Sequence, residues 1–546
     1  MKRWLLAVLV VSVILSLVGT LAVNVPAAPL ARAAEPLEGH FGLPAGAIDH
    51  LEPTLAYTAL SMRIEFVTCT PLVTFPDAEG EEGRQIIGGI AELPEISEDG
   101  KIYTFTLKPG VKFGDGTPIT GEDIKATFER MFNPNLASPG AGFFTEIVGA
   151  EEFAAGEADT IEGIKVDGDK IAFELTQPVG SFMSRLTMPF VCPVPKGTPA
   201  EPMENGELLN TGPYFVESYE PNRSLVLARN PHYNADVMGQ RGKLDRIVID
   251  IGIDPAQAGL MARANQLDLY LDRMAPADAA QALEDPALEG RVFRNPQAAI
   301  VYLWMNNDVP PFDSVKVRQA VNHAINRNAL LRVWGGPSQG MPTDQVLPPT
   351  MPGWQDVDIY PMAGDVEKAK ELLAESGVEL PIQTTLRTIN DQPGFAELAQ
   401  AVQQQLKEVG IEIDVQLSID SVNIGIIQTR ASKVPMGINA WYQDYPDPDN
   451  FLNTLLDGTR ITETNNQNTA NFNNPEINAE LAELAQLTGP DRYTRYHQLD
   501  EKIIREHAPW APLLNPSQVH IISDRVVNYV YHPVYGADLA VISIKE

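Results

Sequence analysis

The sequence predicts an α/β protein, because helix and strand patterns alternate along its second half. Residues 395–409 repeat apolar side chains at helical spacing, and Gly410 ends the pattern. Residues 411–417 follow at once and alternate strictly between apolar and polar types, which indicates a half-buried strand. Two more apolar stripes at helical spacing begin after Ser314 and Asp365, whose side-chain oxygens can cap a helix. The order of helix, glycine and strand favours a lobe in which helices cover a sheet.

The first half of the chain is richer in strand patterns. Residues 103–107 alternate between polar and apolar side chains before a Pro-Gly turn. Residues 214–219 and 224–229 flank a Pro-Asn pair, which predicts a hairpin. Residues 120–123 read Thr-Gly-Glu-Asp, which resembles a capping box and predicts a helix through Met131.

The composition excludes several classes of function. Asp and Glu number 72 against 40 Lys and Arg, which gives a formal net charge of −32. Such a surface repels phosphate backbones and anionic lipid headgroups, so no nucleic-acid or membrane-surface partner is expected. The 8 histidines are scattered and no P-loop or zinc motif is present. We therefore expect no metal and no cofactor, and any ATP hydrolysis must come from a separate subunit.

The N-terminus has the layout of a secretory signal peptide. Lys2 and Arg3 form a basic start, residues 4–23 are almost entirely apolar, and residues 31–33 read Ala-Arg-Ala, a typical cleavage site. We expect residues 1–33 to be removed after export. The apolar run is also long enough to span a bilayer if it stays uncleaved, so an anchored form is the alternative.

The chain has two cysteines, Cys69 and Cys192. Neither lies near the signal segment, so no lipobox cysteine is available for acylation. Export makes a disulfide between them possible, and two separate buried thiols are an equal alternative, because spacing cannot decide.

Two short motifs are set aside. Residues 336–340 match the G-x-S-x-G pattern around Ser338, but the flanking glycines and prolines do not fit the strand and helix that a nucleophile elbow requires. Asp444, Asp447 and Asp449 could suggest calcium, but the prolines between them favour a turn.

Several segments, taken in order, resemble the family 5 extracellular solute-binding proteins, which are the oligopeptide-, dipeptide- and nickel-binding components of ABC importers. These segments are residues 96–118 with Glu122-Asp123, residues 210–214 with 227–233, residues 311–327, residues 441–452 and residues 508–513. Together they extend over nearly the whole chain after the signal segment.

The resemblance implies a bilobal, hinged periplasmic-binding-protein fold of the type II, cluster C kind. Lobe one is then formed by residues 34–68, 206–296 and 512–546, with residues 69–205 as an extra subdomain. Residues 297–511 form lobe two. The chain crosses between the lobes near residues 297 and 512, and a ligand that binds between the lobes stabilises the closed form.

The resemblance also implies a ligand anchor. In peptide-binding members an aspartate shortly after a tryptophan pairs with the α-ammonium of the ligand, and the matching residue is Asp444. A carboxylate in a closed cleft forms a strong, charge-assisted bond with an ammonium group. The alternative is that Asp444 only caps a turn before Pro446.

Other residues are weaker candidates for the same site. Trp441, Tyr442 and Tyr445 would supply flat walls, although alternation along the chain predicts that some of them belong to the core. Asn306 could line the cleft or simply form a turn. Arg430 could meet a ligand carboxylate or lie on the solvated surface.

We therefore expect an exported binding protein, not an enzyme, that captures peptides or similar solutes for an ABC permease with separate ATPase subunits. It should act as a monomer, in the periplasm or at the cell surface. Alternatives with the same fold are binders of an oligosaccharide, an opine or a metal chelate. A serine hydrolase using Ser338 is a distant alternative, as is a sensor or chaperone without transport.

Overall fold

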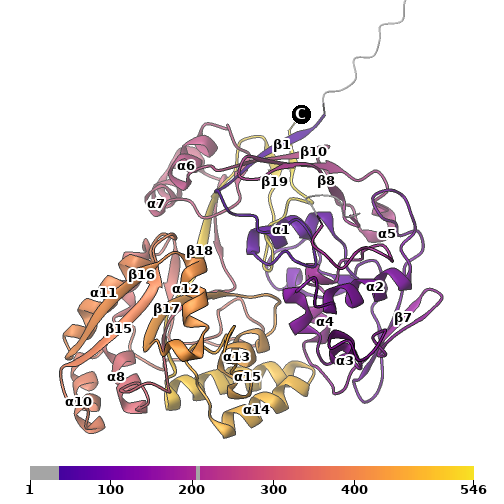
Figure 1. The fold of residues 1–546 in the computed structure, drawn as a ribbon. Coiled ribbons are helices and arrows are strands. Elements are labelled where there is room, and N and C mark those ends of the chain that lie inside the picture. The colour runs from indigo at the N-terminus through magenta and orange to yellow at the C-terminus, as the bar shows by residue number, and fades with distance from the viewer. Residues whose placement is uncertain (1–35, 204–209, 546) are drawn as a thin grey trace, which may run out of the picture. The chain divides into compact units, whose positions relative to one another are not determined.

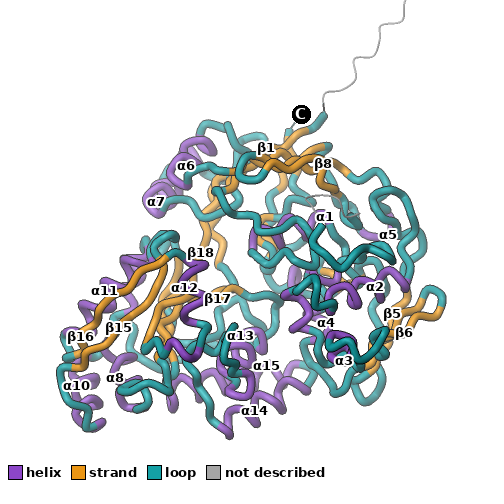
Figure 2. The backbone as a smooth tube through the Cα atoms, viewed as in Figure 1, coloured by secondary structure: helices purple, strands orange, loops and turns teal. Residues whose placement is uncertain are grey.

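A computed structural model describes residues 36–203 and 210–545, and their strands form three larger sheets (Figure 1). The predicted signal segment, residues 1–33, lies outside the described residues. Helices lie on or between the sheets, so the predicted α/β class is confirmed (Figure 2). In the part of the chain that is described, no helix is both long and apolar enough to cross a membrane.

The first sheet has five strands in the order β11-β1-β10-β9-β8. Its strands are β1 (Glu38–Leu43), β8 (Tyr214–Glu220), β9 (Ser224–Arg229), β10 (Arg246–Ile251) and β11 (Leu269–Tyr270). The predicted hairpin is confirmed as β8 and β9, which pair antiparallel. In β10 buried residues alternate with more exposed ones, and Ile247 and Ile249 are fully buried. The helices α1 (Ala59–Thr68), α5 (Ala235–Met238), α6 (Pro255–Arg263) and α7 (Pro276–Glu284) belong to this part of the chain.

The second sheet has four antiparallel strands in the order β4-β5-β7-β6. They are β4 (Glu95–Ile96), β5 (Ile102–Thr106), β6 (Ile164–Asp167) and β7 (Lys170–Glu174), and the helices nearby are α2 (Gly121–Phe132), α3 (Ala150–Ala154) and α4 (Phe182–Arg185). The predicted capping box is present at the start of α2, where the Thr120 N–H donates to Asp123 Oδ2 at 2.8 Å. Phe128 of α2 packs against Phe173 of β7, with ring centroids 5.0 Å apart.

The third sheet has seven strands and follows the order β12-β18-β13-β17-β15-β16, with β14 beside β18. They are β12 (Val292–Pro296), β13 (Ala299–Met305), β14 (Gly340–Pro342), β15 (Ile382–Ile389), β16 (Ile411–Ser418), β17 (Met436–Tyr442) and β18 (Trp510–Ile521). Its helices are α8 (Val315–Ala324), α9 (Arg327–Trp334), α10 (Val366–Ser376), α11 (Phe395–Lys407), α12 (Asp420–Ile427), α13 (Asp449–Leu456), α14 (Pro475–Gln486) and α15 (Pro490–Lys502).

Strand β13 is buried on both faces of the seven-stranded sheet. All seven of its residues are buried, since Leu303 and its odd-numbered neighbours pack with one hydrophobic cluster and Tyr302 and its even-numbered neighbours pack with another. A strand covered on both faces reads as a continuous apolar run, and residues 299–305 read Ala-Ile-Val-Tyr-Leu-Trp-Met. Tyr302 also stacks on Trp510 of the neighbouring β18, with ring centroids 3.6 Å apart.

The helix and strand boundaries predicted in this half agree closely with the structure. Asp365 caps α10 by accepting a bond from the Lys368 N–H at 3.0 Å. Ser314 is at the N-cap of α8, but its side chain makes no capping bond. Helix α11 ends at Lys407, two residues before the predicted end, and β16 then alternates between buried and exposed residues at its start.

Two arginines of this half, Arg318 in α8 and Arg327 in α9, bind the backbone. Both are buried, and they donate to carbonyl groups such as His507 O for Arg318 (2.7 Å) and Pro512 O for Arg327 (2.7 Å). A guanidinium group has five donors, so it can satisfy several carbonyls at once inside the protein.

Further short strand pairs follow at the end of the chain. They are β19 (Val526–Asn528) with β22 (Ser543–Ile544), and β20 (Tyr531–His532) with β21 (Gly536–Ala537); near the start, β2 (Val73–Thr74) pairs with β3 (Ile87–Gly88). The C-terminal segment therefore consists of strands and turns. The division of the chain into lobes at residues 297 and 512 stays a prediction.

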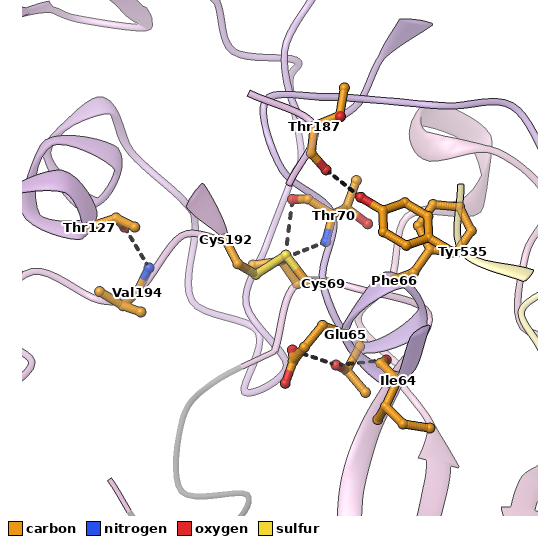
Figure 3. The surroundings of a disulfide bond; sticks show 12 residues. Ile64, Glu65, Phe66, Cys69, Thr70, Thr127, Thr187, Cys192, Val194 and Tyr535 are labelled. Atoms are coloured by element: carbon orange, nitrogen blue, oxygen red, sulfur yellow. Dashed lines mark hydrogen bonds between the residues drawn. A yellow bond between two sulfur atoms is a disulfide. The ribbon is translucent and has the colours of Figure 1, made fainter. Parts of the chain in front are cut away.

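The structure decides between the two alternatives for the cysteines. Cys69 and Cys192 form a disulfide, with their Cα atoms 5.9 Å apart (Figure 3). Cys69 lies at the end of α1, and Cys192 Sγ is 3.5 Å from the hydroxyl of Thr211. Near Cys192, Tyr535 from the C-terminal segment donates to the Thr187 carbonyl at 2.9 Å. The disulfide therefore joins the end of α1 to the segment around residues 187–192, which Tyr535 of the C-terminal segment also contacts.

Replacing both cysteines by serine should lower the free energy of unfolding by about 2–5 kcal/mol, because the disulfide closes a loop of 123 residues that the unfolded chain would otherwise leave free. Urea titration of the wild-type and Cys69→Ser/Cys192→Ser proteins measures the difference. A reducing agent should destabilise only the wild type. Equal unfolding midpoints would show that the disulfide does not contribute to stability.

Candidate functional site

Asp444 lies in the turn between β17 and α13, where Pro446 and Pro448 prevent the strand from continuing. Its side chain is 8% exposed. Asn450 forms two hydrogen bonds with Asp444: Asn450 Oδ1 accepts from the Asp444 backbone N–H at 2.9 Å, and Asn450 Nδ2 donates to Asp444 Oδ2 at 2.7 Å. The hydroxyl of Tyr57 lies close enough to the carboxylate to lower its pKa.

The environment of Asp444 resembles that of a binding group more than that of a turn cap. Among the described residues, no Lys, Arg or His forms an ion pair with it, and no backbone N–H donates to its carboxylate. Burial raises its pKa to about 6, and the hydrogen bond from Asn450 and the proximity of the Tyr57 hydroxyl oppose that rise. The group is therefore mostly ionised at pH 7, and it is a buried anion to which a cation could bind.

Tyr57 was not singled out from the sequence. It stands alone just before α1, almost 400 positions away from Asp444, and no motif surrounds it. Its ring packs against Phe190 and Phe143, with centroids 5.7 and 6.4 Å apart. The side chain is 37% exposed, yet burial and the charge of Asp444 raise its pKa well above the usual value. The ring is therefore accessible to solvent and lies near the charge of Asp444.

The three aromatic candidates have different environments. Tyr442 is 43% exposed, so its ring could face a ligand. Tyr445 is 2% exposed and belongs to the core, where it packs edge-on against Phe143 at 6.1 Å. Trp441 is partly buried, and its Nε1 donates to Asn450 Oδ1 at 3.3 Å. Tyr442 is therefore the strongest wall candidate of the three.

Asn306 and Arg430 do not lie near Asp444 in the structure. Asn306 is next to Pro435, at the start of β17, whereas Asp444 follows the end of that strand. The seven residues of β17 separate the two ends by roughly 20 Å, at about 3.3 Å per residue. Asn306 Oδ1 accepts from the Asp308 N–H at 3.0 Å, as a turn-forming asparagine does.

Arg430 forms ion pairs with Asp308 at 2.9 Å and Glu463 at 3.3 Å. With Asn306, these side chains line a separate pocket of about 410 Å³. The predicted set therefore divides into two groups, and only residues 441–445 lie near the anchor.

The two acidic residues after Asp444 are bound by arginines. Arg492 holds Asp447 through two bonds of 2.6 and 2.8 Å, and Arg185 reaches Asp449 at 3.2 Å. Burial opposes ionisation of Asp449, but Arg185 and Arg492 outweigh it and lower its pKa. These carboxylates are therefore already occupied, which disfavours a calcium loop. Within residues 36–203 and 210–545 no cluster of three metal-ligating side chains is present.

The surroundings of Ser338 do not form a nucleophile elbow. An elbow requires a strand before the serine and a helix after it. Here α9 precedes Ser338 and β14 follows it, which is the reverse order. The Ser338 hydroxyl donates to the Gly335 carbonyl at 3.3 Å.

Comparison with known proteins identifies the family. The model of the bacterial extracellular solute-binding proteins, family 5, matches residues 85–463. Heme-binding protein A of Haemophilus influenzae is 29% identical over 82% of this chain and 82% of its own length. The dipeptide-binding protein of Escherichia coli is 29% identical over 68% of this chain and 70% of its length.

Solved structures agree with this result. A clavulanic acid biosynthesis oligopeptide binding protein matches with a TM-score of 0.87 and 26% identity over 94% of this chain and 96% of that one. Haemophilus influenzae OppA in complex with the peptide RPPGFSPFR has the same fold, with a TM-score of 0.74 and 22% identity over 94% and 99% of the two chains. The chain therefore belongs to the bacterial extracellular solute-binding proteins of family 5, and its fold is their bilobal one.

Proposed function

We propose that this protein captures short peptides by binding their N-terminal ammonium at Asp444. The observation that supports this most directly is a buried carboxylate, 8% exposed, that no cationic side chain of the described residues neutralises. Leaving such a charge unpaired in a closed site costs several kcal/mol, so a ligand ammonium would bind there and a ligand without a cation would not. Tyr442 and Tyr57 would be its aromatic neighbours.

The proposed capture uses the two lobes and the hinge that the family resemblance implies. Strands β12 and β13 would carry the chain into lobe two, and β18 would carry it back. Strand β18 pairs antiparallel with both of them, through Trp510–Leu514 on β13 and Ser517–Ile521 on β12. Paired crossing strands can bend together, which suits a hinge that opens and closes around a ligand.

The proposed role is that of a binding component, not an enzyme. The protein would deliver its ligand to permease subunits that work with a separate ATPase, and it would do so outside the cytoplasmic membrane, with residues 1–33 as the export signal. A relative whose name supports this role is the periplasmic oligopeptide-binding protein OppA of Escherichia coli. The site around Asp444 would also accept another small cation, and heme, an oligosaccharide, an opine or a metal chelate are the competing ligands.

Asp444→Asn should weaken the binding of trialanine at least tenfold, which is about 1.4 kcal/mol. The amide keeps the shape of the side chain but loses the charge that pairs with the ammonium. Isothermal titration calorimetry measures the effect, with N-acetyl-trialanine as a ligand that lacks the ammonium. The matched control is Asp414→Asn, which changes an exposed aspartate on β16. Equal trialanine affinity in wild type and Asp444→Asn would contradict the proposed anchor.

Trialanine affinity should fall by about tenfold between pH 7 and pH 5. The pKa of Asp444 is about 6 in the free protein, and binding requires its ionised form, so below pH 6 a proton must be lost before the ammonium binds. Titrations at half-unit pH steps test this. In Asp444→Asn the pH dependence should be much weaker; an identical pH profile in the two proteins would assign the titration to another group.

A further inference from the structure

A buried charge network joins the region of α4 to the turn that carries Asp444. The guanidinium group of Arg185, the last residue of α4, contacts Asp449 at 3.2 Å and Glu146 at 3.2 Å. The hydroxyl of Ser181 donates to the same Asp449 oxygen. The side chains of Arg185 and Asp449 are only 7% and 2% exposed. Two segments more than 250 residues apart in sequence are therefore connected by a desolvated ion pair.

Backbone contacts reinforce this connection. The Gly180 N–H donates to the Ala485 carbonyl at the end of α14, at 2.8 Å. A side chain at position 180 would collide with the Leu487 carbonyl and with Arg492. Gly180 thus lies directly against residues 485–492, with no room for a side chain.

The same segment fixes the turn around the anchor. Tyr445, the neighbour of Asp444, lies below the Arg185 guanidinium, which is 5.8 Å from the ring centroid. Phe143 packs edge-on against the same ring at 6.1 Å. Arg185 therefore contacts the residues on both sides of the Pro446–Pro448 turn, but it forms no ion pair with Asp444 itself.

We propose that Arg185 is a positioning residue for ligand capture, and that its pair with Asp449 is a latch between the extra subdomain and lobe two. Arg185 holds Tyr445 and Asp449 so that Asp444 stays beside Tyr57 in the closed form. When the lobes open, the pair separates. The part of this proposal that concerns affinity rests on the proposed peptide-binding function; the latch itself does not.

An ion pair is well suited to a contact that must open repeatedly. Burying two charges is costly, and their attraction roughly offsets that cost, so the net stabilisation is small. When the lobes separate, both groups regain water, and neither is left buried without a partner. Deleting one partner in the closed form is different, because the other charge then stays desolvated. The latch can therefore be reversible and still sensitive to substitution.

Hydrogen exchange of the ligand-free protein tests the latch without any ligand. In Arg185→Met, exchange of the Gly180 amide should become at least tenfold faster, because its bond to Ala485 crosses the contact that Arg185 holds. Exchange in β15 and β16 should not change. The control is Arg263→Met, which removes an ion pair with Asp285 at 2.7 Å that lies away from this contact. An unchanged Gly180 rate would overturn the latch.

Trialanine affinity tests the positioning role. Arg185→Met should weaken binding three- to tenfold, Asp449→Asn should do the same, and the double variant should lose little more than either single one. Arg185→Lys should restore part of the loss, since lysine keeps the charge but not the fork that reaches both Glu146 and Asp449. Additive losses would contradict a shared latch.

The outcomes separate the two proposals. If Asp444→Asn loses trialanine and the Arg185 variants bind it normally, the anchor stands and the positioning role falls. If the wild type does not bind trialanine, this prediction of the peptide proposal fails, and hydrogen exchange still decides the latch. If Arg185→Met does not fold, Ser181→Ala replaces it, since it removes another donor to Asp449, and faster Gly180 exchange is again expected.

Discussion

The candidate site depends on the ion pairs that hold the turn between β17 and α13. Three aspartates, Asp444, Asp447 and Asp449, lie within six residues and all are buried. Such a group is stable only if most of the charges are neutralised, and Arg492 and Arg185 do this for Asp447 and Asp449. Among the residues that the structure describes, no cation pairs with Asp444, so the arrangement that stabilises the turn also leaves one carboxylate without a charged partner.

Most of the local secondary structure could be predicted from the sequence. The α11–Gly410–β16 unit, the β8–β9 hairpin and the capping box of α2 are local patterns, and each was predicted within a few residues. The family was also predicted, because its motifs extend along nearly the whole chain. Contacts between segments distant in sequence were harder to predict: spacing alone left the Cys69–Cys192 pair undecided.

The candidate site illustrates the same limit. Residues 441–445 were predicted as a group because they are neighbours in sequence. Tyr57 and Arg185 were missed, since each reaches the turn from a distant segment and neither lies in a recognisable motif. Asn306 and Arg430 were grouped with Asp444, but the antiparallel pairing of β13 with β17 places residues 305 and 436 together at one end and residues 299 and 442 at the other. Strand direction, which no single segment reveals, decides this placement.

The most direct test of peptide capture is to identify the small molecules that remain bound to the protein. The exported protein would be purified from its native cells without denaturation, then unfolded, and the released material analysed by mass spectrometry. The account predicts a set of short peptides with free N-termini, absent from Asp444→Asn prepared in the same way. A single non-peptide molecule, such as heme or a sugar, retained equally by Asp444→Asn, would contradict it.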